Sequence, residues 1–449
     1  MALTRGELLR KMVHMGVGLI AFSLRFLGPF WAAVLAACAL GFNLFVLHRI
    51  GGRRLWRPHE HEAGGSVGII LYPFAVLLLI LIFYPRLEVA AAAWGILAFG
   101  DGMASVVGMS LGRRKLPWNP RKSWMGSLAH LLFGGIAASV LLVWTAPVQG
   151  RAYAWAFALA VGFATALLSA ALESLPHGLD DNIGVPLVSG LFLLGLVLTH
   201  GRWGDFLADP GLGKRLLLAA AFNALLAGAA YAAHTVDRSG VIAGFLVGFL
   251  IYAFLDWRGY LLLIAFFVIG SACTKLGYRK KEERKLAQEN KGRRGARHAL
   301  ANAGVATACA LFAAVTPYPV LFALAFAGAF ATAASDTASS EIGQLLGRRT
   351  YLATNFRPVP RGTEGAVSLE GTLAGVLASL VIAGLGVALG LFSWKGVPAV
   401  AVAAFVGTTF ESVVGAALEK RKLLDNEALN FLNTLVGALV AVAFTPWVV

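Results

Sequence analysis

The chain has 449 residues, of which 58% are hydrophobic and only 14% are charged, against roughly 25% charged residues in an average soluble protein. This composition excludes a disordered chain, a coiled coil and an ordinary soluble enzyme. It predicts an all-α, polytopic integral membrane protein. At about 20 residues per membrane helix, about 14–15 transmembrane helices fill most of the chain and leave no room for a large soluble domain.

Apolar runs bounded by charges, Gly/Pro clusters or turns predict the membrane spans in chain order. The runs lie at 12–28, 30–48, 67–84, 88–111, 127–146, 152–172, 184–200, 214–234, 239–256, 259–277, 299–315, 317–335, 371–394, 397–416 and 428–447.

The distribution of positive charge predicts how these spans are oriented. If the N-terminus is in the cytoplasm, 30 of the 38 Lys and Arg residues fall on the cytoplasmic side, including those of the basic segments 49–57, 275–297 and 420–422. The positive-inside rule accounts for this bias, so the net charge of +15 does not indicate nucleic-acid binding. The Ala-, Gly- and Arg-rich composition favours a bacterial inner membrane.

An internal repeat relates the two halves of the chain. Each half has, in the same order, an Asp followed by small residues at fixed offsets, an Arg pair, a Ser before the next apolar run, a Glu-Ser pair and an Asp-Asn pair. In the first half these are Asp101, Ala104, Gly108, Gly112, Arg113-Arg114, Ser123, Glu173-Ser174 and Asp181-Asn182. In the second half they are Asp336, Ser339, Gly343, Gly347, Arg348-Arg349, Ser368, Glu411-Ser412 and Asp425-Asn426. The repeat predicts two related membrane domains, 1–200 and 201–449, whose motif loops both face the cytoplasm.

The residue types of the repeat are those that bind a metal–nucleotide complex. An Asp at the end of a span offers oxygen ligands to Mg²⁺, and an intramembrane carboxylate is a functional candidate by default. Arg and Lys contact phosphate, and a Ser that opens a helix offers its hydroxyl and the helix N–H groups to an anion. The glycines let backbone approach a ligand, although packing between membrane helices explains the same spacing. The pattern predicts phosphoryl or nucleotidyl transfer at the membrane surface.

In the first half, the residues Asp101-x2-Ala104-x3-Gly108-x3-Gly112-x8-Arg121-Lys122-Ser123-x2-Gly126 resemble the CTP-binding signature of the dolichol kinase and phytol kinase family. The opening Arg10-Lys11-Met12-Val13-His14 and the pair Asp181-Asn182 are also similar to that family. The resemblance implies an all-helical membrane enzyme that uses CTP to phosphorylate a long isoprenoid alcohol. Met125 stands where the family usually has Glu, which bears on whether the first domain is active.

The second half resembles the phytyl-phosphate kinases and their relatives. The matching residues are Asp336-Thr337-x2-Ser340-Glu341-Ile342-Gly343 and a stretch from Arg361 to Gly375 that includes Ser368, Glu370 and Gly371, with Thr274-Lys275 and Asn302 as further matches. This resemblance implies transfer of a second phosphate to an isoprenyl monophosphate, again from CTP.

The repeat and the two resemblances together predict the roles of individual residues. The catalytic set is Asp101, Lys122, Glu173, Asp336, Glu370 and Glu411. The ligands of Mg²⁺ are Asp101, Asp181, Asp336, Glu341 and Asp425. The nucleotide-binding set is Ala104, Gly108, Gly112, Arg121, Ser123, Gly126, Asn182, Lys275, Gly343, Gly347, Arg361, Ser368, Gly371 and Asn426. His130 is predicted to be packed or interfacial.

The predicted function is a bifunctional, CTP-dependent isoprenoid kinase. Domain one converts a prenol of the phytol, geranylgeraniol or farnesol type to its monophosphate, and domain two converts the monophosphate to the diphosphate. The expected partners are the prenol, the prenyl phosphate, the nucleotide and membrane lipid, but no nucleic acid, and the oligomeric state is left open. The alternatives are a cytidylyltransferase that attaches CMP to a lipid phosphate, and a lipid or isoprenoid transporter.

Overall fold

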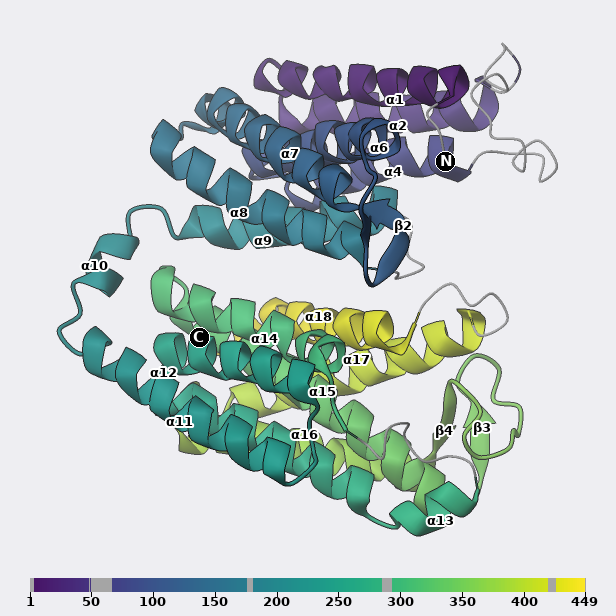
Figure 1. The fold of residues 1–449 in the computed structure, drawn as a ribbon, viewed down its shortest axis with the longest axis vertical. Helices are drawn as coiled ribbons and strands as arrows, with labels where there is room; N and C mark the ends of the chain where they lie inside the picture. Colours follow the sequence, from purple (N-terminus) through teal and green to yellow (C-terminus); the bar gives the residue numbers. More distant parts are fainter. Residues whose placement is uncertain are drawn as a thin grey trace. The chain divides into compact units, whose positions relative to one another are not determined.

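Two compact units make up the chain in a computed structural model, Met1–Val197 (unit 1) and Leu198–Val449 (unit 2). The structure describes residues 4–47, 49, 67–175, 181–284, 293–418 and 425–448. Most of the basic segment 49–57, part of 275–297 and all of 420–422 therefore lie outside the described residues. Figure 1 shows each unit as a bundle of helices. The predicted fold class, a polytopic all-α membrane protein, is confirmed.

In its described residues, unit 1 contains eleven helical segments and one small hairpin. In chain order they are α1 (Arg5–Gly18), the 3-10 helix η1 (Leu19–Arg25), α2 (Pro29–Phe45), α4 (Val67–Ile82), α5 (Leu87–Gly95), the π-helix η3 (Ile96–Asp101), α6 (Gly102–Ser110), β1 (Lys115–Leu116), β2 (Asn119–Ser123), α7 (Trp124–Thr145), the 3-10 helix η4 (Ala146–Gln149), α8 (Trp155–Ser174) and α9 (Asp181–Leu198).

Unit 2 follows a similar plan with longer helices. Its elements are α10 (Trp203–Leu207), α11 (Leu212–Ala232), α12 (Arg238–Lys275), α13 (Tyr278–Glu283), α14 (Ala296–Val315), α15 (Pro319–Leu346), β3 (Thr350–Leu352), β4 (Ala366–Ser368), α16 (Leu369–Ala388), α17 (Gly396–Leu418), α18 (Asn426–Ala443) and α19 (Thr445–Val448). Helix α15 packs against α14, α16, α17 and α18, and its many alanines let these neighbours approach closely.

Among the residues that the structure describes, eleven helices are long and apolar enough to cross a membrane, and two shorter apolar helices lie at Pro29–Phe45 and Gly68–Ile82. The first predicted span, 12–28, does not coincide with a single helix. Helix α1 begins at Arg5, because the hydroxyl of Thr4 caps it by accepting a hydrogen bond from the Glu7 backbone N–H (3.2 Å). The chain then continues as η1.

Helix α12 contains the predicted span 239–256 and most of the predicted span 259–277. Its backbone leaves the helical conformation at Asp256, where φ is +49°. A Cβ placed on Gly240 would lie 2.2 Å from the Arg294 carbonyl oxygen, and one on Gly270 would lie 2.6 Å from Arg294 Nη2. One residue contacts both ends of α12 because the two halves fold back on each other, as the separate spans predict.

The repeat joins equivalent helices in the same way in both units. Helix α6 leads to α7 through the antiparallel hairpin β1–β2, and α15 leads to α16 through β3–β4. Ser123 and Ser368 are the N-caps of α7 and α16, and their Oγ atoms accept hydrogen bonds from Gly126 N (3.2 Å) and Gly371 N (3.1 Å). A Ser at this position satisfies a helix-end N–H group and fixes where the helix begins.

The glycines of the repeat lie where these helices touch. A Cβ on Gly112 would lie 2.3 Å from Ser123 Oγ, and a Cβ on Gly126 would lie 3.0 Å from the carbonyl oxygen of Ala104. In unit 2 a Cβ on Gly371 would lie 2.5 Å from the carbonyl oxygen of Ser339. Residues without a side chain are needed at such distances, so these glycines set the close approach of α6 to α7 and of α15 to α16.

We expect Gly112→Ala to lower the stability of the chain by about 1–3 kcal/mol, because the added methyl group forces the hairpin away from α6. Gly41→Ala in α2 is the matched control, since nothing lies within 4 Å of its Cβ position and Ala is the better helix former by about 1 kcal/mol. Thermal unfolding of the two variants in detergent measures the difference. Equal unfolding temperatures would contradict the close contact.

Candidate active site

Asp101 ends a wide helical turn in the span formed by α5, η3 and α6. Residues Ile96–Asp101 are π-helical, a conformation that often marks functional sites. His14 Nε2 lies 3.0 Å from the carbonyl oxygen of Leu97, and Lys11 Nζ lies 2.6 Å from Asp101 Oδ2. Both side chains come from α1, which packs against η3 and α6. Helix α1 therefore supplies the cation that balances Asp101.

The β1–β2 hairpin carries Lys122 to the ends of α8 and α9. Asn119 Nδ2 donates a hydrogen bond to the carbonyl oxygen of Ser174 (3.1 Å), which holds the hairpin against the last turn of α8. Lys122 Nζ lies 2.6 Å from Glu173 Oε1 and 3.1 Å from Asp181 Oδ2. The ammonium group thus bridges two carboxylates that come from different helices.

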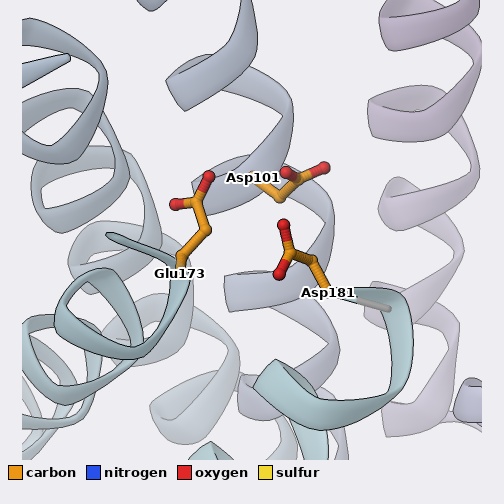
Figure 2. A group of neighbouring side chains, drawn as sticks. All are labelled: Asp101, Glu173 and Asp181. Carbon is orange, nitrogen blue, oxygen red and sulfur yellow. The ribbon is translucent and has the colours of Figure 1, made fainter. Parts of the chain in front are cut away.

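Asp101, Glu173 and Asp181 point toward one another from η3, α8 and the start of α9 (Figure 2). One carboxylate oxygen of each lies within 4.8 Å of the others, and this is the only such group of at least three His, Cys, Asp or Glu in the described part of the chain. Mg²⁺ prefers carboxylate oxygens and is usually bound by one or two carboxylates plus substrate phosphates. The donor set therefore fits this ion.

Lys122 stays protonated at neutral pH although most of its side chain is covered. Burial by itself lowers the pKa of an ammonium group, but the carboxylates of Glu173, Asp181 and Asp101 outweigh burial and raise the pKa of Lys122 above its usual 10.5. Because folding raises this pKa, protonation of Lys122 contributes stability that is complete below its usual pKa of 10.5 and is lost as the pH rises further. The site thus keeps a positive charge for phosphate at physiological pH.

The residues predicted to bind the nucleotide in unit 1 have other contacts in the structure. The set Ala104, Gly108, Gly112, Ser123 and Gly126 forms the contact between α6 and α7 described above, and so it positions Lys122. Arg121 is exposed, and its backbone N–H donates to Asn119 Oδ1 (3.1 Å). Asn182 lies in the first turn of α9, next to Asp181. A nucleotide-binding role for these residues stays a prediction.

In unit 2, Asp336 and Glu411 stand at the positions equivalent to Asp101 and Glu173, and their carboxyl groups lie near enough to interact electrostatically. Asn433 Nδ2 donates a hydrogen bond to Glu411 Oε2. Val367 stands at the position of Lys122, so the bridging ammonium of unit 1 has no counterpart there.

The structure does not bring together the metal set predicted for unit 2. Glu341 forms a buried ion pair with Lys281, because five residues after Asp336 a helical side chain points roughly 140° away. Asp425 caps α18 and pairs with Arg297 Nη2 (2.5 Å). Glu341 and Asp425 therefore have other charged partners in the structure, and their role as Mg²⁺ ligands with Asp336 stays a prediction.

Glu370, the residue at the position of Met125, lies in the first turn of α16. Its carboxylate accepts a hydrogen bond from the Arg348 backbone N–H (3.2 Å), and Arg361 adds to the positive charge around it. In unit 1, the carboxylate cluster of Asp101, Glu173 and Asp181 assembles without a Glu at position 125. The departure at Met125 therefore removes no member of that cluster.

The remaining residues predicted for unit 2 are divided between packing and the surface. Gly343, Gly347, Ser368 and Gly371 make the contact between α15 and α16. Lys275 at the end of α12 and Asn426 at the start of α18 are exposed.

Two residues of the site in unit 1 were not assigned a role from the sequence. Lys11 entered only as part of a family opening, and its partner Asp101 lies 90 positions away. His130 was expected to be packed or interfacial. It is fully buried, and its Nδ1 lies 2.7 Å from Glu173 Oε2. The one local signal is that His130 follows Gly126 by four residues, which places both on one face of α7.

Comparison with known proteins identifies the family. The family described as integral membrane protein DUF92 matches residues 221–438. An uncharacterized membrane protein of Synechocystis sp., sll0875, is 42% identical over 244 residues, which are 54% of this chain and 93% of the relative. The chain belongs to the DUF92 family of integral membrane proteins. No solved structure matches it.

Two other relatives of this DUF92 protein come from Arabidopsis thaliana. "Protein VTE6, chloroplastic" is 38% identical over 220 residues, which are 47% of this chain and 66% of the relative. "Phytol kinase 1, chloroplastic" is 32% identical over 124 residues, which are 27% of this chain and 41% of the relative. The predicted relation to a family that includes phytol kinases is confirmed.

Proposed function

We propose that this protein is a membrane kinase that phosphorylates an isoprenoid alcohol in unit 1 and the resulting monophosphate in unit 2, with CTP as phosphoryl donor and Mg²⁺ as cofactor. The observation that carries the proposal is the cluster of Asp101, Glu173 and Asp181 bridged by Lys122. It combines carboxylates for a metal ion with a cation for phosphate. The name of the relative phytol kinase 1 supports an alcohol of the phytol type, and the choice of CTP rests on the motif at 101–126.

The residues of unit 1 divide the work of phosphoryl transfer. Asp101 and Asp181 would hold Mg²⁺, which when bound neutralises charge on the nucleotide phosphates. Lys122 exchanges its carboxylate partners for the γ-phosphate, a stronger charge-assisted contact, and this frees Glu173 Oε1. Glu173 then accepts the proton of the prenol hydroxyl. The hydroxyl oxygen forms a bond to the γ-phosphorus while the bond to the bridging oxygen breaks, and CDP leaves with the bonding electrons.

Unit 2 would carry out the second transfer at the equivalent place in its bundle. Its acceptor is a phosphate monoester, which is already ionised at neutral pH and needs no base. Asp336 and Glu411, at the positions equivalent to Asp101 and Glu173, would hold Mg²⁺ there. Arg361 and Lys275 would supply the cations that screen two anionic substrates from each other. The matching hairpin and helix contacts of the two units support this assignment.

We place the N-terminus and both motif loops in the cytoplasm of a bacterial inner membrane, because CTP is a cytoplasmic substrate and most basic residues fall on that side. Cytidylyl transfer to a lipid phosphate is the alternative reaction for the same cluster. A transporter is less well supported, because Glu173 and Asp181 lie at the ends of α8 and α9, whereas transporter sites lie near mid-membrane.

The test uses the full chain in nanodiscs with Mg²⁺, geranylgeraniol and CTP labelled on either the γ- or the α-phosphate. We expect label from the γ-position alone, first in the prenyl monophosphate and then in the diphosphate. Label from the α-position in the lipid would establish cytidylyl transfer instead. If no lipid acceptor became labelled from either position, the kinase proposal would be wrong.

A further inference from the structure

We propose that His130 is a positioning residue of unit 1, which fixes the Glu173 carboxylate so that Oε1 faces the acceptor. The inference rests on the proposed function, because Glu173 has this task only in a kinase that acts on an alcohol. Neither the sequence nor the family resemblance assigns a role to this residue.

Both nitrogens of the His130 ring have polar neighbours on α8. Nδ1 lies 2.7 Å from Glu173 Oε2, and Nε2 lies 2.8 Å from Ser169 Oγ. Ser169 and Glu173 are one helical turn apart, so a single ring spans both side chains. The hydrogen bond with Ser169 holds the imidazole beside Glu173, and the close Nδ1–Oε2 approach fixes which carboxylate oxygen faces the ring.

Close packing around His130 fixes the position of its ring. The side chain is fully buried in the contact between α7 and α8. A Cβ on Gly100 would lie 3.1 Å from Nε2, so the absence of a side chain next to Asp101 makes room for the imidazole. The ring therefore lies between the turn that carries Asp101 and the end of the helix that carries Glu173.

The contacts divide the two oxygens of Glu173 between different tasks. Oε2 faces the buried ring of His130, whereas Oε1 accepts a hydrogen bond from Lys122 (2.6 Å), whose side chain is 30% exposed. Only Oε1 can be released when Lys122 moves to a phosphate. His130 contacts a functional carboxylate from behind. Removing a side chain in such a position typically lowers activity or metal affinity by about 10- to 100-fold.

Unit 2 has different residues at the equivalent positions. The positioning role of His130 is therefore not part of the helix packing that both units share. Gly375 stands where unit 1 has His130, and Ser335 stands where it has Gly100. A Cβ on Gly375 would lie 2.7 Å from Ser335 Oγ, so the space of the imidazole is taken. Glu411 interacts with Asp336 and Asn433 instead. The imidazole is thus present only in unit 1, whose proposed acceptor is an alcohol that must lose a proton.

The test compares His130→Ala, His130→Asn and the control Ser139→Ala in the full chain. Asn carries an amide nitrogen near the position of Nδ1, so it retains a donor toward Glu173. Ser139 is equally buried on α7 and also hydrogen-bonds across to α8, at Ala158 O (3.0 Å), but it lies more than two helical turns from the site. Steady-state kinetics with geranylgeraniol and γ-labelled CTP give kcat and KM for each variant.

We expect His130→Ala to lower kcat for monophosphate formation by about 10- to 100-fold with KM for CTP changed less than about threefold. His130→Asn should recover most of that loss, and Ser139→Ala should keep the wild-type kcat. Conversion of geranylgeranyl monophosphate to the diphosphate should be unchanged in all three. A wild-type kcat in His130→Ala, or equal losses in His130→Ala and Ser139→Ala, would overturn the positioning role.

A second measurement does not depend on activity. Unfolding temperatures of His130→Ala, Glu173→Gln and the double variant form a cycle, and we expect the two single shifts not to add because the side chains are in contact. Additive shifts would overturn the contact itself. If the cycle shows coupling but the wild-type chain phosphorylates no prenol, the proposed function fails while the contact between His130 and Glu173 stands.

Discussion

Asp101→Asn is expected to lower prenol phosphorylation by about 1,000-fold. The amide keeps the shape of the side chain but removes the charge that would hold the metal–nucleotide complex, and the loss of one such electrostatic contact typically costs 100- to 1,000-fold or more. Rates of label transfer from γ-labelled CTP to geranylgeraniol measure the effect. A rate above about a tenth of the wild-type rate would show that Asp101 does not take part in phosphoryl transfer.

Loss of folding must be separated from loss of chemistry in this variant. Lys11 pairs with Asp101 at 2.6 Å, and their side chains are only 11% and 13% exposed. Asp101→Asn leaves this ammonium without its partner, which typically costs about 3–5 kcal/mol in a buried pair. The double variant Lys11→Met/Asp101→Asn removes both charges. We expect it to recover most of the unfolding temperature but none of the activity, and recovery of both would mean that Asp101 acts only in stability.

Lys122→Met is expected to reduce the same activity by about 100- to 1,000-fold. The substitution removes the cation that contacts phosphate, and it leaves Glu173 and Asp181 close together without the charge that bridges them. Lys122→Arg keeps a charge in a different geometry and should give an intermediate rate. Kinetics at several CTP concentrations check both variants, and we expect the KM for CTP to rise in each.

Lys115→Met is the matched control for Lys122→Met. Lys115 lies on β1 of the same hairpin, pairs with Ser123 in the strand register and is exposed. Because an exposed charge away from the carboxylates contributes little, this variant should keep the wild-type rate and KM. Equal losses in the two variants would show that the hairpin as a whole, and not the ammonium of Lys122, matters for activity.

Much of the fold could be predicted from the sequence because membrane helices have a strong signal. Long apolar runs gave the helical class, and the charge-bounded gap at 257–258 separated the two halves of α12. The limits of α1 were missed, since its start is set by the cap at Thr4 and not by hydropathy. The short hairpins were not predicted either, because strands of two to five residues have too little sequence pattern to be seen.

The residues of the site that could be predicted are those that recur in both halves of the repeat. Asp101, Glu173 and Asp181 were named because each has a counterpart in the second half, and they lie together in the structure. Glu341 has no such counterpart at its offset, and it turned out to face Lys281. The contacts of Lys11 and His130 depend on how helices far apart in sequence pack, which a single sequence does not express. The spacing of the glycines is compatible with ligand binding and with helix packing. The short distances from their Cβ positions to neighbouring atoms favour packing.

One measurement tests most directly the claim that each unit holds its own phosphoryl-transfer site. Full chains carrying Glu173→Gln or Glu411→Gln are given γ-labelled CTP with either geranylgeraniol or geranylgeranyl monophosphate. We predict that Glu173→Gln makes no monophosphate from the alcohol but still converts the monophosphate to the diphosphate, and that Glu411→Gln does the reverse. If either substitution abolished both reactions, or neither reaction were affected, the two-site account would be contradicted.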